Sequence, residues 1–296
     1  MADGIPWRPH VVEFDGGRLA YFEAGSGEPV VFVSGGPGDS HGYLRAMAAA
    51  FANEFRCVLY DQRGTGQSVH DLSPRTLCVD ALLRDLDHVR EVLGVRRVRL
   101  VGHSWGATLA LLYGIRYPDD VSHLVLVGMG PLDDAAAAVA SANLIRVLSE
   151  SERQEFAALG RGRQEALAQG DAPRAWDLHA RAMPYRARGW FYDAKMAARF
   201  AAEYAASEDR TNFAVHQLVN ASARTIDWGL AIARCHPTFH TLVLYGRQDF
   251  EPIEQAFELQ QQWPNVTVRL INRAGHLPWL EQPREFTQTV QQYLRR

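Results

Sequence analysis

The chain has 296 residues, of which 47% are hydrophobic and 22% charged, and its formal net charge is −3. This length and composition are those of a globular protein with one large domain, or one domain that carries an insertion. A pI near 6.4 excludes the basic excess of a nucleic-acid-binding protein, and no apolar run approaches the ~18 residues of a membrane-spanning helix. Three cysteines are too few and too scattered for a disulfide framework or a zinc site. The first ten residues lack the apolar segment of a signal peptide, so we expect a cytoplasmic protein.

Short apolar runs with turn signals between them predict the strands. Two alternating runs, Val11–Phe14 and Leu19–Glu23, flank Asp15-Gly16-Gly17 and predict a β-hairpin. Later runs are continuously apolar, as expected of strands that are buried on both faces of a sheet. These runs are residues 29–33, 56–60, 98–101, 124–127, 242–245 and 266–271. Apolar residues recur at helical spacing in residues 77–93, 107–115 and 286–294.

The alternation of strands and helices predicts an α/β fold with a mostly parallel, doubly wound sheet. This alternation stops between about Leu132 and Cys235, where only helical spacing remains. We therefore divide the chain into a core, residues 1–131 and 236–296, and a helical insertion, residues 132–235. Ligands of open α/β sheets bind at the carboxyl ends of the strands, so the insertion is expected to form a lid over that edge. The alternative is a helical domain unrelated to the site.

The segment Gly102–Gly106 reads G-H-S-W-G and fits the pattern G-x-S-x-G. It directly follows one predicted strand and precedes a predicted helix. In that setting the two glycines allow a sharp turn that exposes the central serine at the top of the sheet. Ser104 is therefore the predicted nucleophile, and its hydroxyl needs a base to remove the proton. The alternative is a structural turn in which the serine is incidental.

The base and the acid are expected near the ends of later strands, because serine, acid and histidine follow in that order in chains with this turn. His276 lies in the stretch Ala274–Leu277 after the last predicted strand, and Gly275 would let the backbone present the imidazole to the serine. Asp249 lies just past the preceding strand, where it would hold the imidazole in one tautomer and stabilise its cation. Glu251 is the rival for the acid, and is otherwise expected to be a solvated loop carboxylate.

Acyl transfer also needs hydrogen-bond donors for the developing oxyanion. One predicted donor is the backbone N–H of Trp105, the residue after the nucleophile. The second is the N–H of Gly36 in the loop Ser34–Gly38, since a glycine N–H can approach an oxyanion with no side chain intervening. The alternative for Gly36 is a role in the tight turn alone.

Three motifs carry a family resemblance. Ser34–Gly38 resembles H-G-G-P-G with serine in place of histidine, and Tyr60–Ser68 (Y-D-Q-R-G-T-G-Q-S) is similar to Y-D-Q-R-G-x-G-x-S. Gly102–Pro118 resembles the nucleophile turn and the helix that follows it. The chain is thus similar to the α/β-hydrolases, and within them to the proline iminopeptidase group. The resemblance covers about Val30 to Val127 and Thr241 to the end, and implies an α/β-hydrolase fold with an inserted helical lid.

The resemblance is weaker in the lid. In the iminopeptidase group, lid glutamates bind the free amino terminus of the substrate, one of them in an A-W-x-x-W-E stretch. Residues 175–180 read A-W-D-L-H-A, so His179 and Ala180 stand where the family has Trp and Glu. A second family glutamate would correspond to Glu208 or Glu203, for which the alternative is a solvated charge on a helix face. Without a carboxylate partner, an ammonium ion in a closed site is strongly disfavoured.

Aromatic residues of the lid and loops, Trp176 and Trp279 among them, are candidates to line an apolar pocket for the acyl group. The alternative is that they pack the lid against the core.

The sequence predicts a serine hydrolase that cleaves a small ester, lactone or amide through an acyl-enzyme, with an iminopeptidase-like core. The alternatives are a carboxylesterase or lactonase without aminopeptidase activity, and a non-catalytic ligand receptor on the same fold. We expect a small-molecule substrate, with neither nucleic acid nor membrane as a partner. No cofactor or metal is expected, because the sequence has no HExxH motif and no clustered His and Asp spacing.

Overall fold

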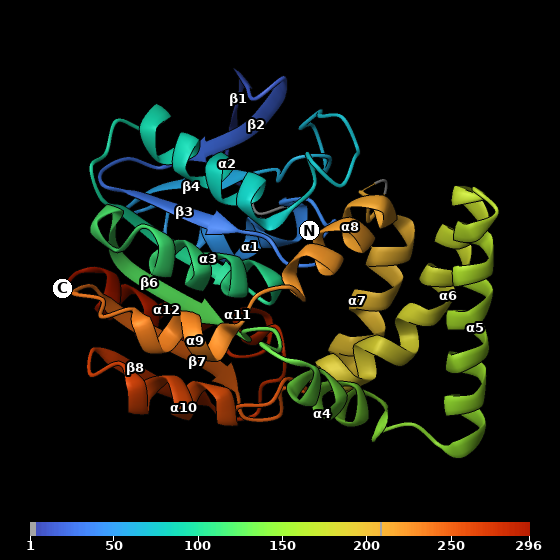
Figure 1. The fold of residues 1–296 in the computed structure, drawn as a ribbon. Coiled ribbons are helices and arrows are strands. Elements are labelled where there is room, and N and C mark those ends of the chain that lie inside the picture. Colours follow the sequence, from blue (N-terminus) through green and yellow to red (C-terminus); the bar gives the residue numbers. More distant parts are fainter. Residues whose placement is uncertain (1–3, 208) are drawn as a thin grey trace.

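An eight-stranded sheet with helices on both faces forms the core of the computed structural model, which describes residues 4–207 and 209–296 (Figure 1). The strands are β1 (Arg8–Phe14), β2 (Gly17–Ala24), β3 (Pro29–Val33), β4 (Arg56–Tyr60), β5 (Val98–His103), β6 (Val121–Val127), β7 (His240–Gly246) and β8 (Val266–Ile271). Their order in the sheet is β1-β2-β4-β3-β5-β6-β7-β8. The first two strands are antiparallel to their neighbours and the other six are parallel. The predicted fold class, including the N-terminal hairpin, is confirmed.

The topology locates the ligand-binding edge. From β3 the chain crosses to β4 on one side and returns to β5 on the other side of β3, which makes the β3–β5 boundary a switch point of the sheet. Loops that leave the two strands there diverge and leave a crevice beyond their carboxyl ends. Ser34–Gly38 follows β3 at this crevice, and Ser104 follows β5.

Continuous apolar strands supply two separate cores because successive side chains point to opposite faces. On β3, Val31 and Val33 join the core that includes α2 (Val79–Val92), α3 (Trp105–Arg116) and α10 (Glu254–Gln262). Val30 and Phe32 join the opposite core with α1 (Arg45–Ala49) and α12 (Pro283–Leu294). The remaining short core elements are α11 (Pro278–Glu281) and 3-10 turns at Gly42–Leu44 and Pro118–Asp120.

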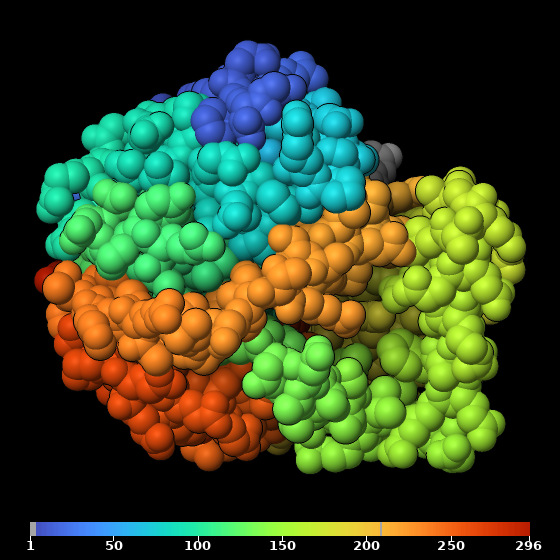
Figure 2. All heavy atoms as spheres, viewed as in Figure 1, coloured from blue at the N-terminus to red at the C-terminus, as the bar shows by residue number. Residues whose placement is uncertain are grey.

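Six helices lie between β6 and β7: α4 (Asp134–Ile145), α5 (Glu150–Ala168), α6 (Ala172–Trp190), α7 (Ala194–Ala206), α8 (Phe213–Ala223) and α9 (Trp228–Arg234). Helices α4 to α7 form a layer beyond the carboxyl ends of the strands (Figure 1). In Figure 2 this green-to-yellow segment stands as a block beside the core. Helices α8 and α9 instead pack on the core through Val215, Val219, Trp228 and Ile232.

Within residues 4–207 and 209–296, no helix combines the length and the apolar character that a bilayer crossing requires. The three cysteines are free, with Cys57 and Cys235 buried and Cys78 partly exposed.

Candidate active site

Ser104 occupies the turn from β5 into α3 in a backbone conformation that few non-glycine residues adopt, with φ +56° and ψ −124°. The flanking glycines allow this turn: a Cβ at Gly102 would lie 2.3 Å from the carbonyl oxygen of Gly106, and one at Gly106 would lie 2.1 Å from that of Val33. The Ser104 N–H donates to the carbonyl of Val127 at 2.9 Å, which ties the turn to β6. The side chain lines a cavity at the carboxyl edge of the sheet.

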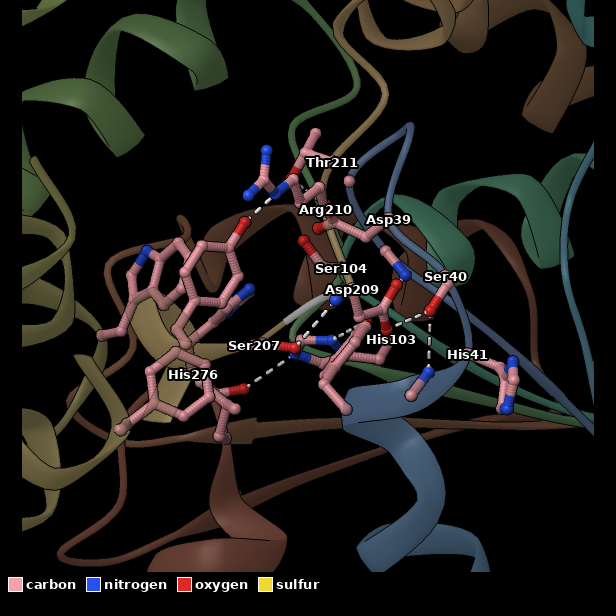
Figure 3. A pocket seen from close by; sticks show the side chains of 18 of the residues that line it. Asp39, Ser40, His41, His103, Ser104, Ser207, Asp209, Arg210, Thr211 and His276 are labelled. Atoms are coloured by element: carbon pink, nitrogen blue, oxygen red, sulfur yellow. Dashed lines mark hydrogen bonds between the residues drawn. The ribbon is translucent and has the colours of Figure 1, made fainter. Parts of the chain in front are cut away.

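His276 and Asp249 form a buried hydrogen-bonded pair. The Nδ1 atom of His276 lies 3.0 Å from Oδ1 and 3.2 Å from Oδ2 of Asp249. The two side chains are 4% and 0% exposed. The His276 backbone N–H donates to the carbonyl of Trp190 at 2.6 Å, and a Cβ at Gly275 would lie 2.1 Å from that same oxygen. Since Asp249 engages Nδ1, Nε2 is the ring nitrogen left for the cavity, which His276 lines together with Ser104 (Figure 3).

Gly128, at the end of β6, packs directly against this pair and was not identified from the sequence as a site residue. A Cβ there would lie 3.0 Å from Oδ2 of Asp249 and 3.0 Å from Nδ1 of His276, and its φ is +52°. The sequence signal that could have identified it is a glycine directly after the strand that neighbours the nucleophile strand.

Of the two predicted oxyanion donors, Trp105 directly follows Ser104, and Gly36 lines the same cavity as Ser104 from the loop after β3. Trp105 is the first residue of α3, so its N–H has no acceptor within the helix. Gly36 is exposed with φ +112°. Its neighbour Gly35 lies nearer the serine, since a Cβ on Gly35 would be 3.1 Å from that of Ser104, but its N–H already donates to the Tyr43 hydroxyl at 2.7 Å.

Gln62, from the Y-D-Q-R-G motif, joins the two halves of this region. Its Nε2 donates to the carbonyl of Ser34 at 2.7 Å, and its Oε1 accepts from the indole N–H of Trp105 at 3.2 Å. The motif thus fixes the loop after β3 relative to the first turn of α3.

His103, which precedes Ser104, is hydrogen-bonded through both of its ring nitrogens. Its Nδ1 lies 2.9 Å from the Tyr43 hydroxyl and its Nε2 lies 3.0 Å from the carbonyl oxygen of His276. Burial, and then the nearby His276, lower the pKa of His103 well below its usual value, so the ring stays neutral.

The cavity has a volume of about 640 Å³ and is lined by residues of the core and of the helical layer. Its charged lining residues are Asp39, Arg45, Asp61, Arg186, Glu203, Asp209, Arg210 and Glu251. Figure 3 shows Ser104 and His276 facing a cluster that the sequence analysis missed, formed by Asp39 and Ser40 after β3 and by Asp209 and Thr211 before α8.

Hydrogen bonds connect that cluster across the cavity. The Ser40 hydroxyl donates to Asp209, and the Thr211 hydroxyl donates to Oδ1 of Asp39 at 2.5 Å. Burial, partly offset by the Thr211 bond, raises the pKa of Asp39 to about 6. These residues come from segments about 170 positions apart, and no local pattern connects them.

Glu251 was expected to be solvated, and that expectation is wrong. The residue is 6% exposed and lines the cavity beside Phe250. Burial, and secondarily the charge of Asp249, raise the pKa of Glu251 well above its usual value. Among the described residues, its Oε2 has no hydrogen-bond partner.

The three predicted substrate contacts have different surroundings. Trp176 and Trp279 are both buried, and neither is among the described residues that line the cavity. Trp176 packs against His179 and Tyr204 with ring centroids 5.6 Å away, and Trp279 meets His103 edge-on at 4.7 Å. Glu208 lies outside the described residues.

His179 is the one described residue of the altered lid stretch 175–180 that lines the cavity. His179 lines the cavity at the position of the family Trp, and its ring is bonded to Arg163 at 3.0 Å and to Tyr204 at 3.1 Å. Glu203 also lines the cavity and pairs with Arg199 at 2.7 Å. Across the described part of the chain, no three His, Cys, Asp or Glu side chains are placed to hold a metal ion.

The profile of the alpha/beta hydrolase fold family matches residues 28–283. A proline iminopeptidase of Xylella fastidiosa (strain Temecula1) is 28% identical over 315 residues, covering 90% of this chain and 92% of the relative. A proline iminopeptidase of Neisseria gonorrhoeae is 27% identical over 276 residues, covering 88% and 86%. The solved structure of an alpha/beta fold family hydrolase from Bacillus anthracis str. Sterne superposes with a TM-score of 0.77 at 18% identity, covering 97% of this chain and 99% of that one.

These similarities confirm the resemblance that the three motifs carry, and they support a hydrolase. The profile match extends over most of the chain, and the sheet has the corresponding topology. The chain therefore belongs to the alpha/beta hydrolase fold family.

Proposed function

We propose that this protein is a serine hydrolase that cleaves a small ester, lactone or amide through an acyl-enzyme on Ser104. The observation that carries the proposal is the shared cavity: Ser104 lines it at a turn with positive φ, and so does His276, whose Nδ1 is bonded to the buried Asp249. A serine becomes a nucleophile when a neighbouring base can take its proton and a third group orients that base.

In the proposed reaction, Nε2 of His276 takes the Ser104 proton while Oγ attacks the substrate carbonyl carbon. Asp249 accepts a hydrogen bond from Nδ1–H and stabilises the imidazolium. The tetrahedral intermediate collapses with cleavage of the bond to the leaving group, which receives the proton from His276. A water then repeats the sequence on the acyl-enzyme and releases the acid product.

We assign the oxyanion donors to the backbone N–H groups of Trp105 and Gly36. The Trp105 N–H is at the N-terminus of α3, where the helix dipole also favours negative charge. The Gly35 N–H already serves the Tyr43 hydroxyl, so Gly36 is the better candidate in the loop after β3. The Gln62 bridge would hold the two donors at a fixed separation.

The helical segment 132–235 is proposed to be the lid of this site, over a core of residues 1–131 and 236–296. Side chains from α4, α6 and α7 line the cavity together with Ser104 and His276. This arrangement supports a partly covered pocket whose wall is shared by the core and the helical segment.

For the substrate, we favour a neutral or anionic acyl compound over an amino-terminal peptide. Ala180 stands where the family glutamate would be, and Arg186 on the same helix lines the cavity. The carboxylates of Glu203 and Asp209 already have partners in Arg199 and Ser40, which leaves them less available to a substrate ammonium.

The second candidate is an aminopeptidase that removes an N-terminal residue, which the two proline iminopeptidase relatives favour. The comparison to make is kcat/KM for proline p-nitroanilide against its N-acetylated form. If the free amine is preferred tenfold or more, an amine-binding carboxylate is present and the aminopeptidase displaces our proposal.

Labelling with a fluorophosphonate probe tests the serine chemistry itself. We expect stoichiometric labelling of the wild type and none of Ser104→Ala. If the wild-type protein does not react, the non-catalytic receptor becomes the better interpretation.

A further inference from the structure

Arg186 is a charged group of the cavity that has no ion pair with any of the described residues. It lies on α6 and lines the cavity, and its Nε is buried with no hydrogen-bond partner among the described residues. The nearest aromatic contact is the ring of Phe156, whose centroid lies 5.6 Å from Cζ. Asp39 acts on Arg186 through its charge, and the two form no ion pair within the described chain.

Burial of a guanidinium without a counter-ion is unfavourable. Burial and the neighbouring Arg163 lower the pKa of Arg186 to about 10, which still leaves it protonated at neutral pH. The protein thus holds a cation in its cavity at a cost, and the positive charge of Arg163 increases that cost.

Most other charged groups of the cavity have a partner within the described chain. The exceptions are Glu251, whose Oε2 has none, and Arg210, which has only an aromatic face but is exposed to solvent. Arg45 contacts the ring nitrogen of His41 and lies over Phe22, Arg210 lies over Trp176, Glu203 pairs with Arg199, Asp209 accepts from Ser40, and Asp39 accepts from Thr211. Among the described residues, Arg186 likewise contacts only an aromatic face, that of Phe156, but unlike Arg210 it is half-buried. The hydrogen-bond donors of its guanidinium edge are therefore left for a ligand.

We propose that Arg186 is a specificity-determining residue that binds a carboxylate group of the substrate. A guanidinium matches a carboxylate in a bidentate geometry, and the pair is strong where water is scarce. The inference rests on the proposed function, because it takes the cavity beside Ser104 to be the substrate site.

The carboxylate can belong to the acyl part or to the leaving group, and two matched substrate pairs distinguish these sources. For the acyl part, the pair is mono-p-nitrophenyl glutarate and its methyl ester. For the leaving group, the pair is 3-acetoxybenzoate and methyl 3-acetoxybenzoate. Within each pair the reacting ester is the same and only the remote charge differs.

The test compares kcat/KM for both pairs in the wild type, Arg186→Met, Arg186→Lys and the control Arg181→Met. Arg181 is on the same helix but is 60% exposed and pairs with Asp177, so its loss removes a lid charge without touching the cavity. In one pair we expect the wild type to prefer the carboxylate by about tenfold or more. Arg186→Met should abolish the preference, Arg186→Lys should retain part of it, and Arg181→Met should keep it.

The proposal is overturned if Arg186→Met leaves the carboxylate preference of both pairs as in the wild type, or if the wild type shows none. Should Arg186→Met fail to fold, the comparison of Arg186→Lys with the wild type decides the same question. Thermal unfolding of each variant identifies a folding failure.

A binding experiment separates failure of this inference from failure of the serine mechanism. Calorimetry measures the affinity of 5-oxohexanoate and of 2,6-heptanedione, an anionic and a neutral ketone that have no ester bond to hydrolyse. We expect the monoanion to bind tighter to the wild type and to lose that advantage in Arg186→Met. Equal affinities in the wild type would count against Arg186 even if Ser104 is the nucleophile. If the monoanion binds more tightly but none of the ester substrates is hydrolysed, the serine mechanism is refuted and the role of Arg186 in carboxylate binding is retained.

Discussion

Substitution of Gly128 by alanine is expected to displace the His276–Asp249 pair without removing any functional group. The added Cβ would lie 3.0 Å from Oδ2 of Asp249 and 3.0 Å from Nδ1 of His276, which is closer than such atoms normally approach. The neighbours therefore have to move by a few tenths of an ångström. The φ of +52° adds a backbone cost of roughly 1–2 kcal/mol for a non-glycine residue.

The expected loss of activity follows from that displacement. A misplacement of about 1 Å in a catalytic group can cost about a hundredfold in rate, so a smaller shift of the His276–Asp249 pair should lower kcat roughly ten- to a hundredfold. KM should change little, because Gly128 is not among the described residues that line the cavity. The backbone strain should lower the unfolding temperature by a few degrees.

Gly94→Ala is the matched control. Gly94 has φ +70° and no heavy atom within 4 Å of the position a Cβ would occupy. Its substitution should reproduce the loss of stability while kcat on p-nitrophenyl acetate stays at the wild-type value. Steady-state kinetics and circular-dichroism melting curves on both variants provide the comparison. If the two variants have the same kcat, the His276–Asp249 pair next to Gly128 does not carry the reaction.

Four other substitutions test the site. Ser104→Ala should abolish turnover while the unfolding temperature stays near that of the wild type, and a normal kcat would place the nucleophile elsewhere. Asp249→Asn should lower kcat by roughly 10⁴ through the wrong imidazole tautomer. Glu251→Gln should change kcat by less than about threefold, because the carboxylate that is hydrogen-bonded to His276 is that of Asp249. The reverse ranking would make Glu251 the acid. Asp39 has a pKa raised to about 6 in the folded state, so its ionisation costs stability as the pH rises from about 4 to 6. Asp39→Asn should remove that loss, which amounts to at most about 3 kcal/mol for two pKa units, and urea titrations that show the same pH dependence for both proteins would contradict this electrostatic account.

The core could be predicted because its strands are buried on both faces. A run such as 29–33 is apolar throughout, and the structure has β3 at Pro29–Val33. Helix α10 was missed because only Gln255, Ala256 and Leu259 of its nine residues are buried, which gives a weak periodic signal. The position of the three proposed catalytic residues could be predicted for a topological reason, since the carboxyl ends of parallel strands meet at one edge.

The environments of single charged residues could not be predicted in the same way. Glu251 has the sequence context of an exposed loop but is buried, and Asn143 on α4 donates to the carbonyl of its neighbour Phe250 at 3.1 Å. That contact spans 107 positions in the chain. Arg186 looks like a solvated helix residue in the sequence, and its burial depends on how α5, α6 and α7 pack. Burial of this kind is a property of tertiary packing and has no local signature.

In the lid stretch A-W-D-L-H-A, the histidine that replaces the family Trp takes part in a series of hydrogen bonds. Arg163 donates to Nδ1 of His179, so the ring is neutral with its proton on Nε2, and burial with nearby arginines lowers the pKa of this histidine to about 3. The Nε2–H then donates to the Tyr204 hydroxyl at 3.1 Å, which can donate to Thr211 at 2.8 Å, which in turn donates to Asp39 at 2.5 Å.

In this series of hydrogen bonds every group donates in the same direction, from the guanidinium of Arg163 on α5 to the carboxylate of Asp39 in the loop after β3. A tryptophan in place of His179 could donate one hydrogen bond but accept none, so Arg163 would lose its partner and the series would be broken. His179, which stands at the position of the family Trp, therefore connects α6 to the loop that holds Gly36. Arg186 lies on the same helix as His179, and both residues line the cavity together with Ser104.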